Sequence, residues 1–128
     1  MFSAHAHHYQ RLTYSCADGR QVPYLIVGSG GHAPVEPLAE RCDGSFGTPP
    51  QLPVRPVAPP GFAFPEGDSA EMVAYNDKEH GFMRMTLDLK HRTLIGEYFA
   101  AYNASSGSTG VPALRDSFTL DLSKHRLS

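Results

Sequence analysis

Apolar and polar residues alternate most regularly in the second half of the chain. Over residues 82–89, methionine or leucine occupies every second position, and arginine, threonine and aspartate lie between them. Because successive side chains of a strand point to opposite faces, this pattern predicts a half-buried strand. A polar reversal at 90–92 and a second apolar segment at 93–101 complete an antiparallel hairpin, and residues 117–122 predict a last strand.

The apolar positions of the first and last of these strands are expected to face the same side. An apolar face of a sheet must pack against another element, whereas the polar positions between the apolar ones can face solvent. The apolar residues concerned are Met83, Met85, Leu87, Leu89, Phe118, Leu120 and Leu122.

The first half of the chain also favours strands. Phe2–Ser3 has the character of a strand end, residues 12–15 predict a short strand, and Ala-Asp-Gly-Arg at 17–20 predicts a tight turn. The apolar run at 24–27 is typical of a strand buried on both faces, and residues 71–76 predict a short mixed strand. No segment has helical periodicity over ten residues, so the chain is predicted to be β-rich with about five or six strands.

Residues 33–64 differ from the rest of the chain, because eight of the eleven prolines lie there. Proline removes a backbone donor and fixes φ, so this composition opposes both a helix and a sheet ladder. We expect an irregular surface loop with at most a short helical turn within 35–42; it is either a functional loop or a mobile insertion. The Ser/Gly-rich residues 103–110 predict a second loop.

Composition limits the classes of function. The 128 residues form at most one domain, and 41% apolar residues are enough for a hydrophobic core. A net charge of −2 gives no basic footprint for nucleic acid. We find neither a membrane-spanning apolar run nor a signal-peptide pattern. Cys16 and Cys42 form neither a metal-binding pair nor a disulfide framework, which favours a soluble protein of the reducing cytoplasm.

The residues with the clearest chemistry gather near the start of the chain. Residues 3–11 contain three histidines, a tyrosine and an arginine. Histidine is the commonest neutral metal ligand, and residues at i and i+2 of an extended segment point to the same side. His5 and His7 are therefore candidate ligands for one metal site or for two neighbouring ones, on a turn that follows a strand.

Four motifs along the chain occur in an order that is found in a known family. They are His-x-His-x-Tyr-x-Arg at 5–11, Gly-x-Gly-Gly at 28–31 after an apolar strand, Gly-Phe-x-Arg-x-Thr at 81–86, and Asp-Ser-Phe-Thr-Leu at 116–120. This order resembles the C-terminal part of the calcineurin-like metallophosphoesterases, especially their purple acid phosphatase-like branch. The resemblance covers most of residues 1–128 and leaves out the proline-rich loop at 33–64.

The resemblance implies a fold and an activity. In the family, two packed β-sheets are flanked by helices in an α/β domain, and residues 1–128 would be the β-rich C-terminal portion, mostly antiparallel strands and long loops. The reaction would be hydrolysis of a phosphate ester, as in an acid phosphatase. The dinuclear site would hold two divalent or trivalent ions of iron, manganese or zinc, with a bridging hydroxide.

The resemblance also implies roles for individual residues. His5 is similar to the family histidine that ligates one metal, and His7 is similar to the one that ligates the other. Tyr9, Arg11 and His32 would be placed to contact the phosphate ester. For Arg11 an ion pair with an acidic residue of the fold is the favoured alternative, and for His32 a loop-capping role is open.

The chain departs from the family pattern in two ways. Ala4 replaces the usual glycine before the first histidine. The aspartates, the Asn-His pair and the further histidine that complete the family site have no counterpart in the sequence. We therefore expect an inactive fragment that lacks the N-terminal half of the domain.

One alternative belongs to a different class, namely a non-catalytic β-sandwich module that binds a partner through its proline-rich loop. Other polar residues have structural interpretations. We expect Arg84 and Asp116 to make contacts within the fold, and His8 to lie at the surface or behind the ligands. The remaining histidines in turns or in the tail are expected to be solvated; they are His80, His91 and His125.

Overall fold

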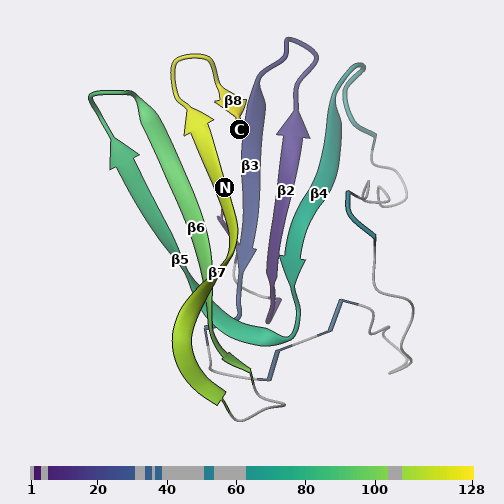
Figure 1. The fold of residues 1–128 in the computed structure, drawn as a ribbon. Coiled ribbons are helices and arrows are strands. Elements are labelled where there is room, and N and C mark those ends of the chain that lie inside the picture. Colours follow the sequence, from purple (N-terminus) through teal and green to yellow (C-terminus); the bar gives the residue numbers. More distant parts are fainter. Residues whose placement is uncertain are drawn as a thin grey trace.

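The computed structural model describes residues 2–3, 6–30, 34–35, 37–38, 51–53, 63–103 and 108–128, and only the backbone at 3, 102, 103 and 108–110. These residues form eight strands and no helix (Figure 1). The strands are β1 Phe2–Ser3, β2 Tyr9–Ser15, β3 Gln21–Val27, β4 Ser69–Asn76, β5 Glu79–Asp88, β6 Thr93–Asn103, β7 Ser108–Asp121 and β8 Arg126–Leu127.

The strands form two four-stranded sheets. The first has the order β1-β3-β2-β4 and the second the order β5-β6-β7-β8. All neighbours are antiparallel except β1, which runs parallel to β3. The prediction of a β-rich chain with mostly antiparallel strands is confirmed. Within the described residues, no helix is long and apolar enough to cross a membrane.

The chain crosses from the first sheet to the second at one end of the molecule (Figure 1). At this end β3 and β4 finish, β2 and β5 begin, and residues 77–78 carry the chain between the sheets. We call this end the rim, because the segments that carry the candidate residues meet there. At the opposite end the β5–β6 turn stands apart from the first sheet, whereas the β7–β8 turn is joined to β3, since the His125 carbonyl accepts the Gln21 N–H over 2.7 Å.

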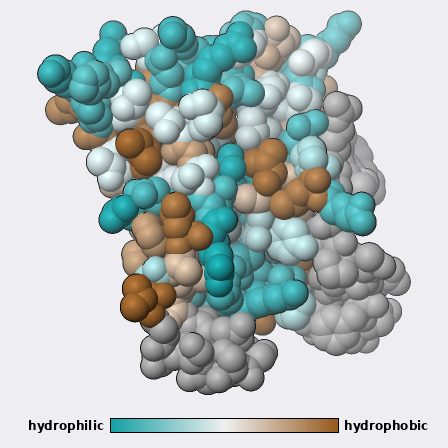
Figure 2. All heavy atoms as spheres, viewed as in Figure 1, coloured by the Kyte–Doolittle hydropathy of each residue, from teal (hydrophilic) through white to brown (hydrophobic). Residues whose placement is uncertain are grey.

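The core between the sheets contains two tyrosines together with smaller apolar residues. The rings of Tyr9 and Tyr98 stack at a centroid distance of 3.9 Å and an interplanar angle of 3°. Leu25 and Phe118 complete the buried cluster, and Met83 and Met85 pack against it. On the face drawn in Figure 2, hydrophobic side chains lie in separate patches among hydrophilic ones.

The predicted hairpin at 82–101 is confirmed, with longer strands than expected. Register places Met83, Met85 and Leu87 on the same face as Asp116, Phe118 and Leu120, as predicted. The expectation that the whole row is buried is wrong, because Leu87 is 54% exposed and Leu89 is 78% exposed. Both lie near the β5–β6 turn, which stands apart from the first sheet (Figure 1).

The prediction that residues 24–27 are buried on both faces is wrong. Leu25 is 1% exposed, whereas Tyr24 is 36% exposed. Burial on both faces requires cover on both sides, as in a parallel sheet between helices. Here β3 lies in a mainly antiparallel sheet and packs against the second sheet on one face, so its burial alternates.

The predicted loop at 103–110 is too long. Asn103 still belongs to β6, and β7 already begins at Ser108, although Pro112 interrupts the apolar pattern. The register between the two strands shifts between Ala100 and Tyr102, and such an irregularity accommodates a proline without breaking the strand.

The described part of the proline-rich segment at 33–64 contains no strand and no helix, and only Leu38 is in a turn. This agrees with the predicted irregular loop for those residues. The rest of the segment lies outside the described residues, and so do His32 and His5.

Candidate functional site

The first segment at the rim is the bend at 6–8, between β1 and β2. The chain turns back there, since β1 runs parallel to β3 and β2 runs antiparallel to it. The His8 N–H donates to the Ala6 carbonyl over 2.9 Å, which tightens the bend. His7 lies in this bend, beyond β1, as predicted, and its side chain is half-buried. His8 is buried, with its Nε2 2.6 Å from the Gln10 side-chain nitrogen, and does not lie at the surface.

The second segment is Gly28–Gly30, which follows β3. The Gly28 N–H donates to the His8 carbonyl over 3.0 Å, so the two turns are joined directly. Ser29 is buried at 1% exposure, and its carbonyl accepts the Gly81 N–H over 3.0 Å. The bend at 6–8, the glycine turn and the start of β5 are therefore connected by backbone hydrogen bonds.

Tyr98 of β6 supplies a side-chain link among the same segments. Its hydroxyl lies 2.8 Å from the Ser29 hydroxyl and donates to the Glu79 carbonyl over 3.2 Å. Burial raises the pKa of Tyr98, which keeps the hydroxyl protonated. The Tyr98 ring also stacks on Tyr9, the residue that follows His8.

His80 lies at the second position of β5, not in a turn as expected. Its Nδ1 is 3.2 Å from the Ser29 carbonyl oxygen, a contact in which the tautomer protonated at Nδ1 donates. The other two histidines of the expected solvated group, His91 and His125, are exposed and lie in turns.

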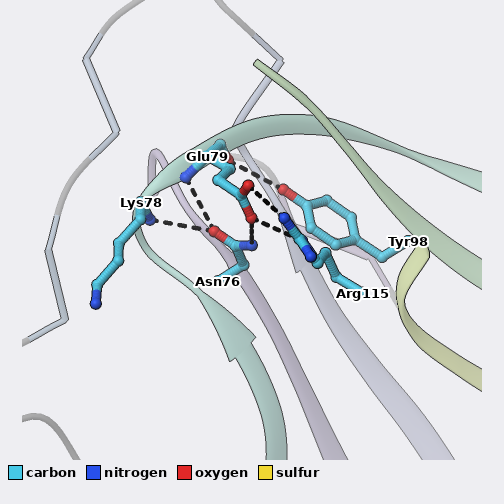
Figure 3. Close-up of polar contacts among 5 residues, drawn as sticks. All are labelled: Asn76, Lys78, Glu79, Tyr98 and Arg115. Atoms are coloured by element: carbon cyan, nitrogen blue, oxygen red, sulfur yellow. Dashed lines mark hydrogen bonds and ion pairs between the residues drawn. The ribbon is translucent and has the colours of Figure 1, made fainter. Parts of the chain in front are cut away.

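A polar cluster fixes the connection from β4 to β5 (Figure 3). Glu79 accepts two hydrogen bonds from Arg115, at 2.9 and 2.7 Å, and one from the Asn76 amide at 2.7 Å. The Asn76 side-chain oxygen accepts the backbone N–H groups of Lys78 and Glu79. A hollow of about 410 Å³ lies over residues 75–79.

The charges of this cluster limit its chemistry. The hydrogen bonds from Arg115 lower the pKa of Glu79, and the Asn76 amide adds to the effect. Figure 3 shows the Lys78 side chain pointing away from the carboxylate. Because Glu79 is ionised, it has no proton to donate as a general acid. Because its oxygens accept hydrogen bonds from Arg115 and Asn76, it is also poorly suited to act as a general base, and we infer that the cluster orders the turn.

Tyr9 and Arg11, both predicted to bind substrate, point into the space between the sheets. The Tyr9 hydroxyl donates to Asp116 over 2.6 Å, and Arg11 donates to the same carboxylate at 2.7 and 2.9 Å. Burial raises the pKa of Tyr9, and the hydrogen bond to Asp116 adds to the rise. The expectation that Arg11 forms an ion pair within the fold is confirmed, as are fold contacts for Asp116 and for Arg84, which pairs with Glu97.

The donor set for a metal is only partly described. The His7 imidazole is a suitable ligand in a half-buried bend. Among the described residues, no group of three or more histidine, cysteine, aspartate or glutamate side chains is placed to hold a metal ion. His7 therefore fits as one ligand, and a complete site needs donors outside the described residues.

A groove on the outer face of the first sheet has a different character. Its volume is about 380 Å³ and its walls are almost entirely apolar. The residues that line it are Gln10, Leu12, Tyr14, Tyr24, Ile26, Phe64 and Ala70. Because its described lining includes no carboxylate, imidazole or cation, we do not take this groove as a candidate for acid–base or metal chemistry.

Comparison of the chain with protein-family models, with curated proteins and with solved structures found no match.

Sequence reasoning missed the residues that hold the rim together. Tyr98 lies outside the four motifs, Ser29 fills the variable position of the second motif, and their contact spans 69 positions of sequence. Gly81 gave a signal, since it begins one of the four motifs. A Cβ at Gly81 would lie 2.3 Å from the Phe99 carbonyl and 2.5 Å from the Tyr98 hydroxyl. Only glycine leaves room for Tyr98 to reach the rim.

Proposed function

We propose that this chain is the C-terminal portion of a metal-dependent phosphoric ester hydrolase of the calcineurin-like, purple acid phosphatase-like type. Its substrates would be phosphate esters, and two ions of iron, manganese or zinc would be held in part by His5 and His7. Each ion would receive one ligand from this pair, whereas catalytic zinc sites, for example, use three protein ligands. The remaining ligands must come from other residues.

The observation that supports the proposal is that the four motifs, far apart in sequence, contact one another. His8 in the first motif binds Gly28 in the second, and Ser29 in the second binds Gly81 in the third. Tyr9 and Arg11 in the first motif bind Asp116 in the fourth. Separate motifs that fold into one hydrogen-bonded set are expected of residues that shape a common site.

The contacts change the proposed roles of two residues. Because Asp116 engages the Tyr9 hydroxyl and the Arg11 guanidinium, these groups are better suited to hold the histidine-bearing bend than to bind phosphate. His32 stays the candidate for substrate contact. We also keep the cytoplasm as the proposed compartment, since a free cysteine such as Cys16 suits a reducing environment.

The test is to express the product of the reading frame extended upstream and to assay p-nitrophenyl phosphate hydrolysis with manganese, iron or zinc. We expect metal-dependent turnover that His7→Ala abolishes and His91→Ala, at an exposed turn, leaves unchanged. An upstream frame that encodes neither the missing aspartates nor an Asn-His pair would contradict the proposal.

A second candidate is the non-catalytic β-sandwich module. The observation in its favour is that the two sheets share a buried core of their own, Tyr9, Leu25, Tyr98 and Phe118. In this case the proline-rich loop would bind the partner. Deletion of residues 39–50 would then abolish partner capture, and His7→Ala would have no effect on it; the opposite result would exclude the module.

A further inference from the structure

We propose that Tyr98 is a positioning residue for the histidine-bearing bend, and that it acts by locking three rim segments into one arrangement. The inference rests on the proposed function, because it concerns the same metal-directed site. Tyr98 is fully buried on β6. Its effect would pass through Tyr9, Ser29 and Glu79.

The first contact is the ring stack with Tyr9. The two ring planes are nearly parallel, with an angle of 3° between them, and the ring centroids are 3.9 Å apart. Tyr9 follows His7 and His8 directly, so the position of its ring fixes where β2 begins and where the bend stands. The Tyr9 hydroxyl is itself held by Asp116, which leaves the ring little freedom to slide.

The second contact is the hydroxyl of Tyr98. When it donates to the Glu79 carbonyl, the Ser29 hydroxyl donates to it in turn, and both bonds are satisfied. Ser29 belongs to the glycine turn whose Gly28 N–H binds the His8 carbonyl. The single hydroxyl therefore links β5 to the turn that supports the histidine-bearing bend.

The absence of a side chain at Gly81 is the third observation. A Cβ there would lie 2.5 Å from the Tyr98 hydroxyl and 2.7 Å from the ring carbon that bears it. The glycine that begins the third motif therefore leaves room for the Tyr98 hydroxyl. This gives a physical reason for a glycine at the start of that motif.

The test compares Tyr98→Phe with Tyr14→Phe. The first variant keeps the ring stack and removes only the hydroxyl. The second removes a hydroxyl that is also hydrogen-bonded, to Asp68, but at the far end of β2. Thermal unfolding confirms that both variants fold. The probe is Zn²⁺ alone, titrated into the purified chain and followed through the histidine ring proton resonances in NMR spectra.

In Tyr98→Phe we expect the dissociation constant for Zn²⁺ at His5 and His7 to rise about tenfold, as for other residues that orient metal ligands indirectly. Tyr14→Phe should bind Zn²⁺ like the wild type. Equal affinity in Tyr98→Phe and the wild type would overturn the inference alone. A wild type whose histidine resonances respond no differently from His5→Ala/His7→Ala would overturn the metal-directed role of Tyr98, whereas the proposed function fails separately, if the upstream frame encodes none of the missing ligands.

Amide hydrogen exchange tests the lock without metal. Loss of the hydroxyl should speed exchange at Gly28 and Gly81 about tenfold, because the buried Ser29 hydroxyl loses its partner. Exchange at Gly19, whose N–H binds Cys16 in the turn after β2, should stay unchanged. Unchanged exchange at Gly28 and Gly81 would show that Tyr98 does not hold the rim, whatever the chain does with Zn²⁺.

Discussion

The carboxylate of Asp116 accepts three hydrogen bonds from residues of the opposite sheet. Side chains of Arg11 and Asp116 are 14% and 12% exposed, so the pair is shielded from solvent. An ion pair of this kind stabilises little compared with apolar packing, but removing one partner leaves an uncompensated charge. Loss of Asp116 should therefore destabilise the sandwich strongly.

We predict that Asp116→Ala lowers the free energy of unfolding by about 3–5 kcal/mol, since it strands the Arg11 charge and the Tyr9 hydroxyl. Urea unfolding measures the change. Glu97→Gln is the control, because it breaks an equally well-formed pair with Arg84 at the surface and should have little effect. Similar losses of stability in the two variants would show that the contacts of Asp116 with Tyr9 and Arg11 stabilise the protein no more than a surface ion pair does.

Glycine at position 96 permits the close approach of Phe118. A Cβ there would lie 2.3 Å from the Phe118 ring and 2.8 Å from the Met83 methyl group. Gly96→Ala should therefore destabilise the protein by about 1–3 kcal/mol through overpacking. Gly30→Ala should be tolerated, because no atom of the described residues lies within 4 Å of the added carbon. Equal thermal midpoints for the two variants would count against this packing.

At the scale of strands, the sequence predicted what depends on local alternation. Residues 82–101 were recognisable as a hairpin because period-two patterning and a polar reversal act over short distances. The burial of 24–27 was mispredicted, since a continuous apolar run gives no sign of which face will be covered. The extent of β7 was missed because a proline looks like a strand end until its partner strand is known.

The predictions for the candidate site also succeeded where they depended on local pattern and failed where they depended on tertiary contacts. The position of His7 on a turn followed from the local pattern. The contacts of Arg11 with Asp116 and of Ser29 with Tyr98 depend on which strands face each other, and no local pattern specifies this. A motif shows which residues matter, but their partners come from tertiary register.

Leu25 of β3 and Leu89, in the turn after β5, test the observed burial. Leu25→Ala should cost about 2–5 kcal/mol, because it empties space in the core between the sheets. Leu89→Ala should change stability by no more than about 0.5 kcal/mol, because the side chain is 78% exposed. Chemical unfolding of both variants measures this, and a larger loss for Leu89 would mean that the strand faces are reversed.

The link between β5 and β7 should be sensitive to acid. Arg115 lowers the pKa of Glu79 in the folded state, so this link stabilises the protein above the ordinary glutamate pKa. Its contribution is lost as the pH falls through the lowered folded value. Glu79→Gln should show a shallower fall of stability between neutral pH and acid; an identical pH profile of unfolding would refute the assignment.

For the whole molecule, the expected catalytic outcome is negative. Two histidines cannot hold two metal ions, so the chain alone should hydrolyse p-nitrophenyl phosphate little or not at all with manganese, iron or zinc. The comparison is the His5→Ala/His7→Ala variant, which should behave in the same way. Metal-dependent turnover that the double substitution abolishes would reveal a complete site within these 128 residues.

The contacts of Asp116 with Tyr9 and Arg11, which join the two sheets, also influence the order in which the molecule can fold. Tyr9 and Arg11 meet Asp116 across 107 and 105 positions of sequence. Contacts of such long range must close large loops before they add stability, which places folding in the slow range typical of β-sandwiches. During synthesis the histidine-bearing segment leaves the ribosome well before Asp116 and must wait until β7 has been made. The local meander β5–β6–β7 can form before it, so the rim is expected to be the last part of the molecule to take shape.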